Sequence, residues 1–481
     1  MNSTVEINLG YERTKLNKTY IYLLIINILC IIAAVITFAF CFDKEYRWIV
    51  LLPIAYMAIK TVYHFIVQQF NCEFTGGLIY KAALGAIFIR FVITPVSIAL
   101  TDKFYYPNVY TSKSSINFAV ILMIFELLII YTTIFLAVMY YSKKYGTNQN
   151  NAVEMPKKYF VLIIFVILGL AILLLVEPIL IIPREFLVLS KNYTKVSLDK
   201  KYDGFYYTIA DITKPLLFII AFSGIHKIYD RSKSRIFVWL SFIVVVLFVG
   251  TYTGTKRWEI VFTGIIGMYL LKKTYNKLPK SLTLGFGLLL LISFISISLV
   301  KFSWIVSNSA NPVKDIIIDM FGFFQYYFSG PGVVANSIEM KEVYGRYIGL
   351  KTFINDFTGC IPLISKIVDQ SNRINAYFNR YYNLSNTPLI IPMIGIGYTY
   401  FPIFPPVFTA IFEWLAVKTD FKLKRSKSIE YKYLYLYFGF YLSMCVGFNT
   451  QIIFGKFLIP FLPLLVLFKL NEKICLENGG R

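Results

Sequence analysis

The stretch INFAVILMIFELLIIYTTIFLAVMYY, at residues 116–141, carries only one charged residue, Glu126. An apolar run of about 18 residues or more is long enough to cross the roughly 30 Å hydrocarbon layer of a bilayer as a helix. Such a run has to be helical, because lipid offers no partners for its backbone N–H and C=O groups. Similar runs recur along the whole chain. The sequence therefore predicts an all-α polytopic membrane protein.

The composition indicates the same class. Of the 481 residues, 57% are hydrophobic and only 15% are charged, and the mean hydropathy is +0.63. Soluble globular domains usually have about a quarter of their residues charged. The net charge of +22 would suggest nucleic acid as a partner of a soluble protein. Here many of the basic residues fall in short loops between apolar runs, where membrane topology accounts for them. We therefore expect no nucleic-acid partner.

About twelve membrane spans are expected, with both termini in the cytoplasm. Spans 1 to 9 lie within residues 1–303, and spans 10 to 12 with a cytoplasmic tail lie within 393–481. Between spans 9 and 10, residues 304–392 form one large external loop, which we expect to contain a few short amphipathic helices. The expected spans are 20–42, 48–69, 77–100, 116–141, 159–182, 205–226, 236–253, 257–271, 281–303, 393–417, 432–448 and 453–469.

The basic residues of alternate loops give this orientation, since cytoplasmic loops are enriched in Lys and Arg. The segment 183–204 should be external and is nevertheless basic, which suits an anionic ligand. The clusters that we assign to the cytoplasm are Lys143, Lys144, Lys157 and Lys158, then Lys227, Arg231, Lys233 and Arg235, then Lys272, Lys273, Lys277 and Lys280, and finally Lys418, Lys422, Lys424, Arg425 and Lys427.

Charged residues inside spans are the first candidates for a functional site, because they are costly in lipid and face a cavity or a partner. Arg90 lies on the outward half of the third expected span, and Asp211 lies on the outer part of the sixth. They have two interpretations. They line a polar cavity open to the outside, or they form structural ion pairs, for example Arg90 with Glu126 or with Asp211.

A second candidate is the segment GTKRWE at 254–259, where the eighth expected span begins. Adjacent cations, Lys256 and Arg257, are unfavourable for the helix dipole at a helix start. The free N–H groups at the same place favour binding of phosphate, and an arginine adds bidentate geometry. The alternative is an interfacial anchor of Trp and basic residues.

The external loop supplies a third set of candidates. Aromatic faces and hydrogen-bonding groups are a combination that suits sugars, and arginines suit a diphosphate. The alternative is an amphipathic interfacial segment with solvated charges. No metal site is expected from two histidines and scattered cysteines. The candidate loop residues are Tyr326, Tyr327, Arg346, Arg373 and Arg380.

Three short motifs resemble those of the Wzy family of O-antigen and capsule repeat-unit polymerases. They are a Gly-x-Arg-type motif opening a span (Gly254 to Arg257), the Tyr-Phe-Ser-Gly-Pro stretch at 327–331, and Asn386-Thr387-Pro388 followed by Gly395 and Gly397. The resemblance covers roughly 250–415. The chain departs from the family in one respect: no arginine has a glycine eleven positions on, as in the Arg-x10-Gly motifs of some members.

The resemblance implies a glycosyltransferase of the bacterial cytoplasmic membrane that needs no metal, nucleotide or other cofactor. Its substrate would be a polyprenyl-diphosphate-linked oligosaccharide, and its partners membrane lipids and the chain-length regulator and flippase of the same pathway. Arg257 and Lys256 would bind the diphosphate, Glu259 or Asp211 would act as general base, and Asn386 and Thr387 would contact substrate. Two alternatives remain open: a flippase for the same lipid-linked sugars, and an O-antigen ligase-like glycan transferase.

Overall fold

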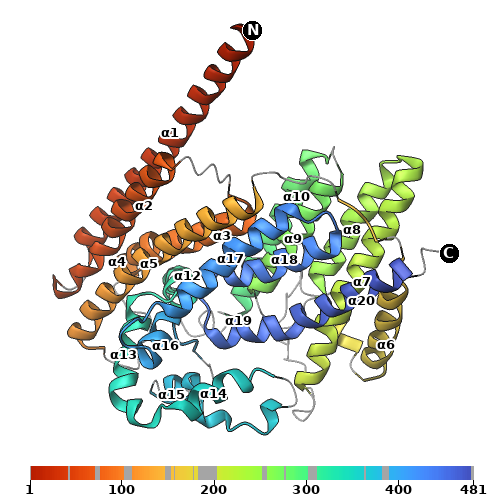
Figure 1. Ribbon diagram of the computed structural model, residues 1–481. Coiled ribbons are helices and arrows are strands. Elements are labelled where there is room, and N and C mark those ends of the chain that lie inside the picture. The colour runs from red at the N-terminus through yellow and green to blue at the C-terminus, as the bar shows by residue number, and fades with distance from the viewer. Residues whose placement is uncertain are drawn as a thin grey trace.

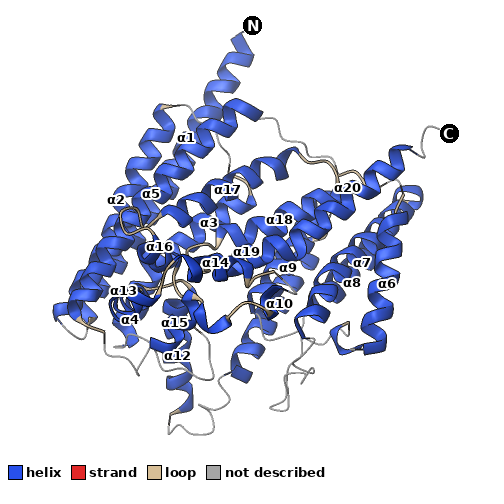
Figure 2. Ribbon diagram, turned by 60° about the horizontal axis from the view of Figure 1, so that its bottom comes forward, coloured by secondary structure: helices blue, strands red, loops and turns tan. Residues whose placement is uncertain are grey.

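The computed structural model of this chain describes residues 2–41, 44–70, 76–101, 111–146, 153–156, 158–176, 178–181, 203–251, 257–275, 278–301, 311–361, 364–381 and 389–477. Within these ranges the chain forms helices and short helical turns and no β-strand, apart from a single bridge between Glu154 and Ser428. The predicted all-α class is therefore confirmed (Figure 2).

The N-terminal part is a layer of long helices. It consists of α1 (Asn2–Phe40), α2 (Leu51–Gln69), α3 (Leu78–Phe88), α4 (Thr94–Thr101) and α5 (Lys113–Tyr145). A π-helical turn, Ile89–Ile93, joins α3 to α4, so that the two form one interrupted rod. Helices α1 and α2 pack together, and α2 also packs against α5. In Figure 1 this layer lies at the left, with the N-terminus far from α14 and α15.

A second group of helices lies on the opposite side of the molecule (Figure 1). Helix α7 packs between α6 and α8, α8 packs against α9, and α9 packs against α10. From α7 to α10, each helix packs against the next along the chain. The bounds are α6 (Phe160–Val176), α7 (Asp203–Ser232), α8 (Ile236–Gly250), α9 (Arg257–Thr274) and α10 (Lys280–Lys301).

The C-terminal helices occupy the centre. They are α16 (Met393–Tyr400), α17 (Val407–Arg425), α18 (Ile429–Ser443), α19 (Thr450–Lys456) and α20 (Leu462–Glu477). Helix α18 is buried along almost its whole length and contacts α3, α9, α17 and α20. Because α17 also packs against α5, the two C-terminal helices join the two outer groups into one core.

The expected continuous span at 393–417 is wrong. Helix α16 ends at Tyr400 and α17 begins only at Val407. The intervening segment, FPIFPP, contains three prolines, which lack a backbone N–H and disfavour helical geometry in the residue before them. The chain turns back so closely here that a Cβ on Gly397 would collide with the carbonyl oxygen of Pro405.

One helix of the segment that was expected to form an external loop is buried and does not lie on the surface. Its helices are α12 (Pro312–Tyr327), α13 (Pro331–Tyr344), α14 (Leu350–Thr358) and α15 (Ile374–Tyr381). Residues Pro331–Met340 of α13 are all buried, and this helix packs against α5, α15 and α16. Small residues in PGVVANS allow this close packing on every side. Helix α13 is therefore part of the bundle and is not an amphipathic surface helix.

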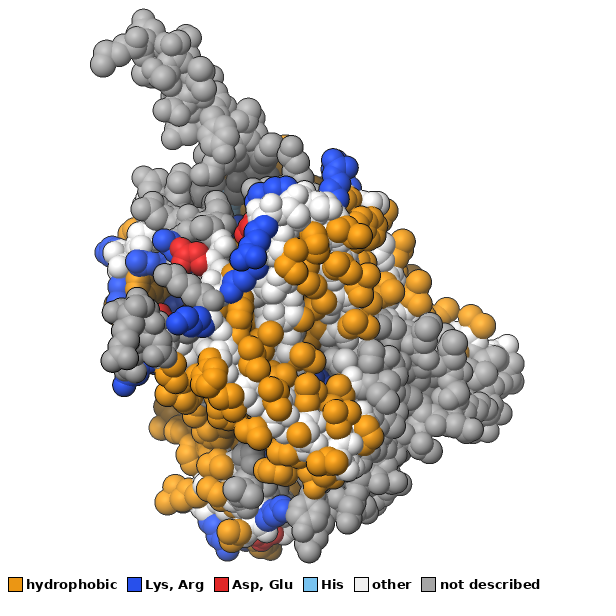
Figure 3. All heavy atoms as spheres, turned by 90° about the vertical axis from the view of Figure 1, so that its right-hand side faces the viewer, with side chains coloured by type: hydrophobic (Ala, Val, Ile, Leu, Met, Phe, Trp, Pro, Cys, Tyr) orange, Lys and Arg blue, Asp and Glu red, His pale blue; other side chains and the backbone are white. Residues whose placement is uncertain are grey.

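Helices occur at all twelve expected spans, but the structure supports fewer crossings by length and composition. Among the described residues, six helical stretches are long and apolar enough to cross a membrane: Tyr20–Phe40, Tyr46–Gln69, Leu78–Thr101, Lys113–Tyr145, Phe205–Ser232 and Thr450–Ile474. Shorter apolar helices are Phe160–Val176, Ile236–Gly250 and Lys280–Ile295. Figure 3 shows hydrophobic side chains across the middle of one face, with Lys and Arg toward its upper and lower ends. That distribution suits a bilayer.

Candidate functional site

Three charged side chains from distant parts of the chain meet between α7, α9 and α19. The Lys456 ammonium lies 2.8 Å from Oε1 of Glu259 and 3.7 Å from Oδ2 of Asp211. The side chains of Lys456, Asp211 and Glu259 are 14%, 22% and 7% exposed. The structure therefore brings together two predicted site residues, Asp211 and Glu259, through a lysine that the sequence analysis did not select.

A break in the helical stretch that begins at Thr450 fixes the position of Lys456. The lysine is the final residue of α19, and a π-helical turn follows at Phe457–Phe461. Within this turn Ile459 leaves helical geometry (φ −138°, ψ 108°), as the following Pro460 favours. Such π-helical turns often mark functional sites. The available sequence signal was a single lysine in the apolar run IIFGKFLIP, at 452–460, four residues before a proline.

Tyrosines of α18 form one wall of this cluster. The Tyr441 hydroxyl lies 3.5 Å from Oε1 of Glu259 and donates a hydrogen bond to it. The Lys456 ammonium lies 5.3 Å from the centroid of the Tyr441 ring, and the rings of Tyr437 and Tyr441 are 5.3 Å apart. The cluster has two carboxylates and one ammonium, so its formal charge is −1. It is therefore better suited to accept a proton than to bind a diphosphate.

The start of α9 lies beside the cluster. Helix α9 begins at Arg257, as predicted, and Glu259 lies in its first turn, where the helix dipole stabilises an anion. On α7, Lys214 donates a 2.5 Å hydrogen bond to the carbonyl of Thr251, at the end of α8. Thr251 is the last described residue before Arg257, so this hydrogen bond anchors the end of α8. Lys256 and the Arg257 side chain lie outside the described residues.

The residue that directly follows the Gly254–Arg257 motif packs against the 327–331 motif. The Trp258 ring lies edge-on to Tyr327 and Phe328, with ring centroids 6.0 and 5.7 Å away. A Cβ on Gly447, in the turn after α18, would collide with the carbonyl oxygen of Tyr327. Tyr326 stacks edge-on against Tyr327, at 5.2 Å between centroids. Trp258, Tyr326, Tyr327 and Phe328 therefore pack together as one aromatic cluster, in which Phe328 is buried. Trp258 directly precedes Glu259 of the charged cluster.

Arg90 contacts the turn that follows Phe328 and forms the ion pair that was one of its two predicted interpretations. Its Nη1 is 2.8 Å from Oε2 of Glu126, and both side chains are fully buried. Its Nε donates a 3.2 Å hydrogen bond to the carbonyl of Ser329, which has a positive φ of 49°. Thr409 donates to the other oxygen of Glu126, at 2.7 Å. Arg90 thus holds the Ser-Gly-Pro turn in place and does not line an open cavity.

Arg373 also makes contacts within the protein. Its Nη2 donates to the carbonyl of Asp356, and its Nη1 donates to Gln370. The Asp356 carboxylate accepts hydrogen bonds from Tyr400 (2.6 Å), Gln451 (2.5 Å) and the backbone of Ile374 (3.0 Å). Burial raises the pKa of Asp356, while these hydrogen bonds act against the rise. This network attaches α14 and α15 to α16 and α19.

The remaining predicted residues are peripheral or undescribed. Arg346 and Arg380 are exposed on the 311–381 segment, and Arg380 stacks on Tyr377 at 5.2 Å. Asn386 and Thr387 lie outside the described residues, as does most of the basic segment 183–204. Comparison of the chain with family models, with curated proteins and with solved structures gives no match.

Proposed function

We propose that this chain is a polymerase of the bacterial cytoplasmic membrane that joins polyprenyl-diphosphate-linked oligosaccharide repeat units on the external face, for O-antigen or capsule synthesis. The observation that carries the proposal is the contact of Trp258 with Tyr327 and Phe328. This contact joins the start of α9, directly after one motif, to the 327–331 motif, and Trp258 is next in the chain to Glu259 of the charged cluster. Flat aromatic rings beside carboxylates suit a sugar substrate.

The reaction in this proposal is a glycosyl transfer. A hydroxyl of the incoming repeat unit attacks the anomeric carbon of the growing glycan, the carbon–oxygen bond to the diphosphate breaks, and polyprenyl diphosphate leaves. The hydroxyl proton goes to a carboxylate acting as general base. Cations near the leaving diphosphate would stabilise its developing charge, and we assign this role to Lys256 and Arg257 at the start of α9.

Between the two carboxylates, we assign the base role to Asp211. It is the more exposed of the two, and its distance to Lys456 is 3.7 Å against 2.8 Å for Glu259. A carboxylate in a close ion pair is a weaker base, because the cation stabilises its ionised form. Glu259 then holds Lys456 in position.

Transport of the same lipid-linked sugars is the second candidate function, and broken helices favour it. Arg90 lies in the π-helical turn Ile89–Ile93, and Lys456 directly precedes the one at Phe457–Phe461. Transporters bind substrates where membrane helices are discontinuous. Against this, Arg90 is fully buried in its ion pair with Glu126, so of these two π-helical turns only the one after Lys456 has a partly accessible charge beside it.

Deletion of the gene in its own host separates the two functions. Loss of a polymerase leaves export intact, so single repeat units should reach the outer surface while long chains disappear. Loss of a transporter should trap lipid-linked units on the cytoplasmic side. Sizing the glycans on lipid carriers and at the cell surface therefore decides between them, and units confined to the inner leaflet would rule out the polymerase.

A further inference from the structure

A groove at the lysine-rich end of the α9–α10 hairpin combines a basic rim with an apolar floor. The cavity has a volume of about 1200 Å³. Lys272 and Lys273, in the last turn of α9, and Lys280, the first residue of α10, line one end. Leucines of α10 line the other end: Leu284, Leu288 and Leu291. No acidic side chain lines it among the described residues.

The apolar floor follows one face of α10. Lys280, Leu284, Leu288 and Leu291 recur at intervals of four, four and three residues, which places them on the same side of a helix. At about 1.5 Å of rise per residue, the distance from Lys280 to Leu291 is roughly 16 Å. The three leucines are 69%, 51% and 54% exposed. This geometry matches an elongated apolar chain with a negatively charged head.

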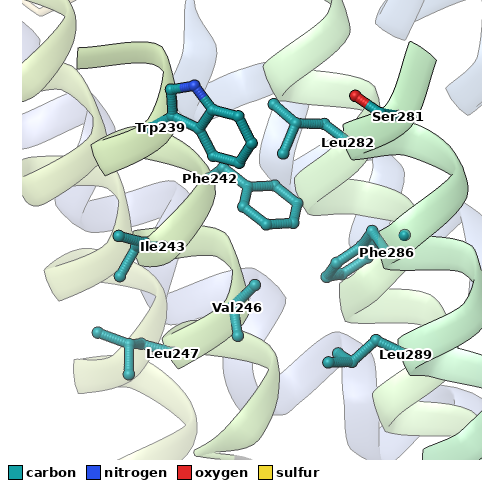
Figure 4. A pocket seen from close by; sticks show the side chains of 10 residues that line it. Trp239, Phe242, Ile243, Val246, Leu247, Ser281, Leu282, Phe286 and Leu289 are labelled. Atoms are coloured by element: carbon teal, nitrogen blue, oxygen red, sulfur yellow. The ribbon is translucent and has the colours of Figure 1, made fainter. Parts of the chain in front are cut away.

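A neighbouring groove on the same helix provides an internal comparison. It lies between α8 and α10, has a volume of about 470 Å³, and is lined by aromatic and aliphatic side chains with one serine. Figure 4 shows Trp239 and Phe242 of α8 facing Leu282 and Phe286 of α10 across it. The described lining of this second groove includes no charged residue. An apolar chain fits both grooves. Only the first groove has basic side chains, which would favour a negatively charged head group over a neutral one.

We propose that the lysine groove binds an anionic phospholipid, with its phosphate at Lys272, Lys273 and Lys280 and an acyl chain along the leucines of α10. The argument is charge complementarity, because Lys272 and Lys280, together with Lys273, line one end of a groove whose described lining contains no acidic side chain. Basic side chains near a membrane surface attract anionic lipid by about fivefold in affinity each. The site is independent of the proposed polymerase activity, since it lies at the other end of α9 from Glu259.

Lipid retention by the purified full-length chain tests this site. Native mass spectrometry should show phosphatidylglycerol bound more tightly than phosphatidylcholine. The double variant Lys272→Ala/Lys280→Ala should lower phosphatidylglycerol affinity by roughly 25-fold, from two contributions of about fivefold. The charge-conserving Lys272→Arg/Lys280→Arg should retain the lipid. A matched control is Lys143→Ala/Lys144→Ala, which removes the corresponding basic pair from the last turn of α5.

Three results would overturn the proposal. Equal loss of lipid in the Lys143/Lys144 control would show a diffuse charge effect, and equal retention of phosphatidylcholine would show that the lysines give no selectivity. Displacement of the lipid by millimolar inorganic phosphate would show an ion site without a lipid component. If the double alanine variant does not fold, Leu288→Glu serves instead. This exposed position adds a negative charge to the apolar floor and should also release the anionic lipid.

Discussion

The Lys456 ammonium and Oε1 of Glu259 lie 2.8 Å apart, although the two residues are 197 positions apart in the chain. The pair connects α9 to the broken helix α19 and holds the ammonium within reach of Asp211. A charge that is mostly removed from water is costly unless it is paired. This contact therefore links two helices of the bundle and also lies at the centre of the candidate site.

Removing only Lys456 should destabilise the protein strongly. In Lys456→Met, Glu259 keeps its charge at a mostly buried position and loses its partner, a loss that typically costs about 3–5 kcal/mol. The neutral double variant Lys456→Met/Glu259→Gln should recover most of this stability. Thermal unfolding in detergent measures both. The exposed pair of Lys233 and Asp230, at 2.9 Å, is the control, and Lys233→Ala should change little. Equal melting temperatures for Lys456→Met and wild type would show that the pair has no structural role.

Arg90 should tolerate no single replacement. Arg90→Lys retains a positive charge but lacks the forked geometry that reaches both the Glu126 carboxylate and the Ser329 carbonyl. We expect a clearly lowered melting temperature for Arg90→Lys and a larger fall for Arg90→Ala, of about 3–5 kcal/mol in the free energy of unfolding. The neutral pair Arg90→Met/Glu126→Gln should be more stable than Arg90→Ala. The opposite order would refute the buried ion pair.

Two glycines near the site should respond oppositely to the same change. Gly447→Ala places a methyl group against the carbonyl oxygen of Tyr327 and should displace Tyr327 from the Trp258 ring that it contacts. Gly455 has no neighbouring atom within 4 Å of an added Cβ, so Gly455→Ala should be neutral or stabilise α19 by up to about 1 kcal/mol. Tryptophan fluorescence and melting temperature report both changes. Similar behaviour of the two variants would contradict the close packing at Gly447.

The predicted orientation can be tested at two exposed positions. In a Cys360→Ser background, a cysteine at Leu350, which is 75% exposed, should react with a membrane-impermeant thiol reagent in intact cells. A cysteine at Lys427, whose side chain is 53% exposed, should react only after the cells are permeabilised. Loop charges motivate this expectation. The reverse pattern of labelling would place the 311–381 segment inside the cell and remove the external site.

Local patterns in the sequence predicted the helices and left the Arg90–Glu126 ion pair as one of two open interpretations. The apolar run around Glu126 became α5, and the expectation that Arg90 pairs inside the bundle follows from the cost of an unpaired charge in lipid. The break at 401–406 was also readable, because three prolines within FPIFPP oppose a continuous helix. Here the apolar composition of 393–417 misled the prediction.

Long-range contacts were the part that the sequence did not reveal. Nothing near Lys456 indicates that its partners are Glu259 and Asp211, because these pairings depend on how α7, α9 and α19 pack. For the same reason the burial of α13 was missed, since PGVVANSIEM has no apolar periodicity that marks it as a core helix. Arg373 has an ordinary loop sequence around it, and only its contacts with Asp356 and Gln370 show a structural role.

The most direct test of the central claim measures glycan chain growth with purified protein. Membranes from the deletion strain, which hold unpolymerised lipid-linked units, are mixed with the reconstituted chain, and the products are sized by electrophoresis. Wild-type protein and Lys233→Ala should each produce a ladder of increasing chain length. Asp211→Asn should be folded, with a melting temperature close to that of wild type, and should produce no ladder. An unchanged ladder from Asp211→Asn, or no ladder from folded wild-type protein, would contradict a polymerase centred on Asp211, Glu259 and Lys456.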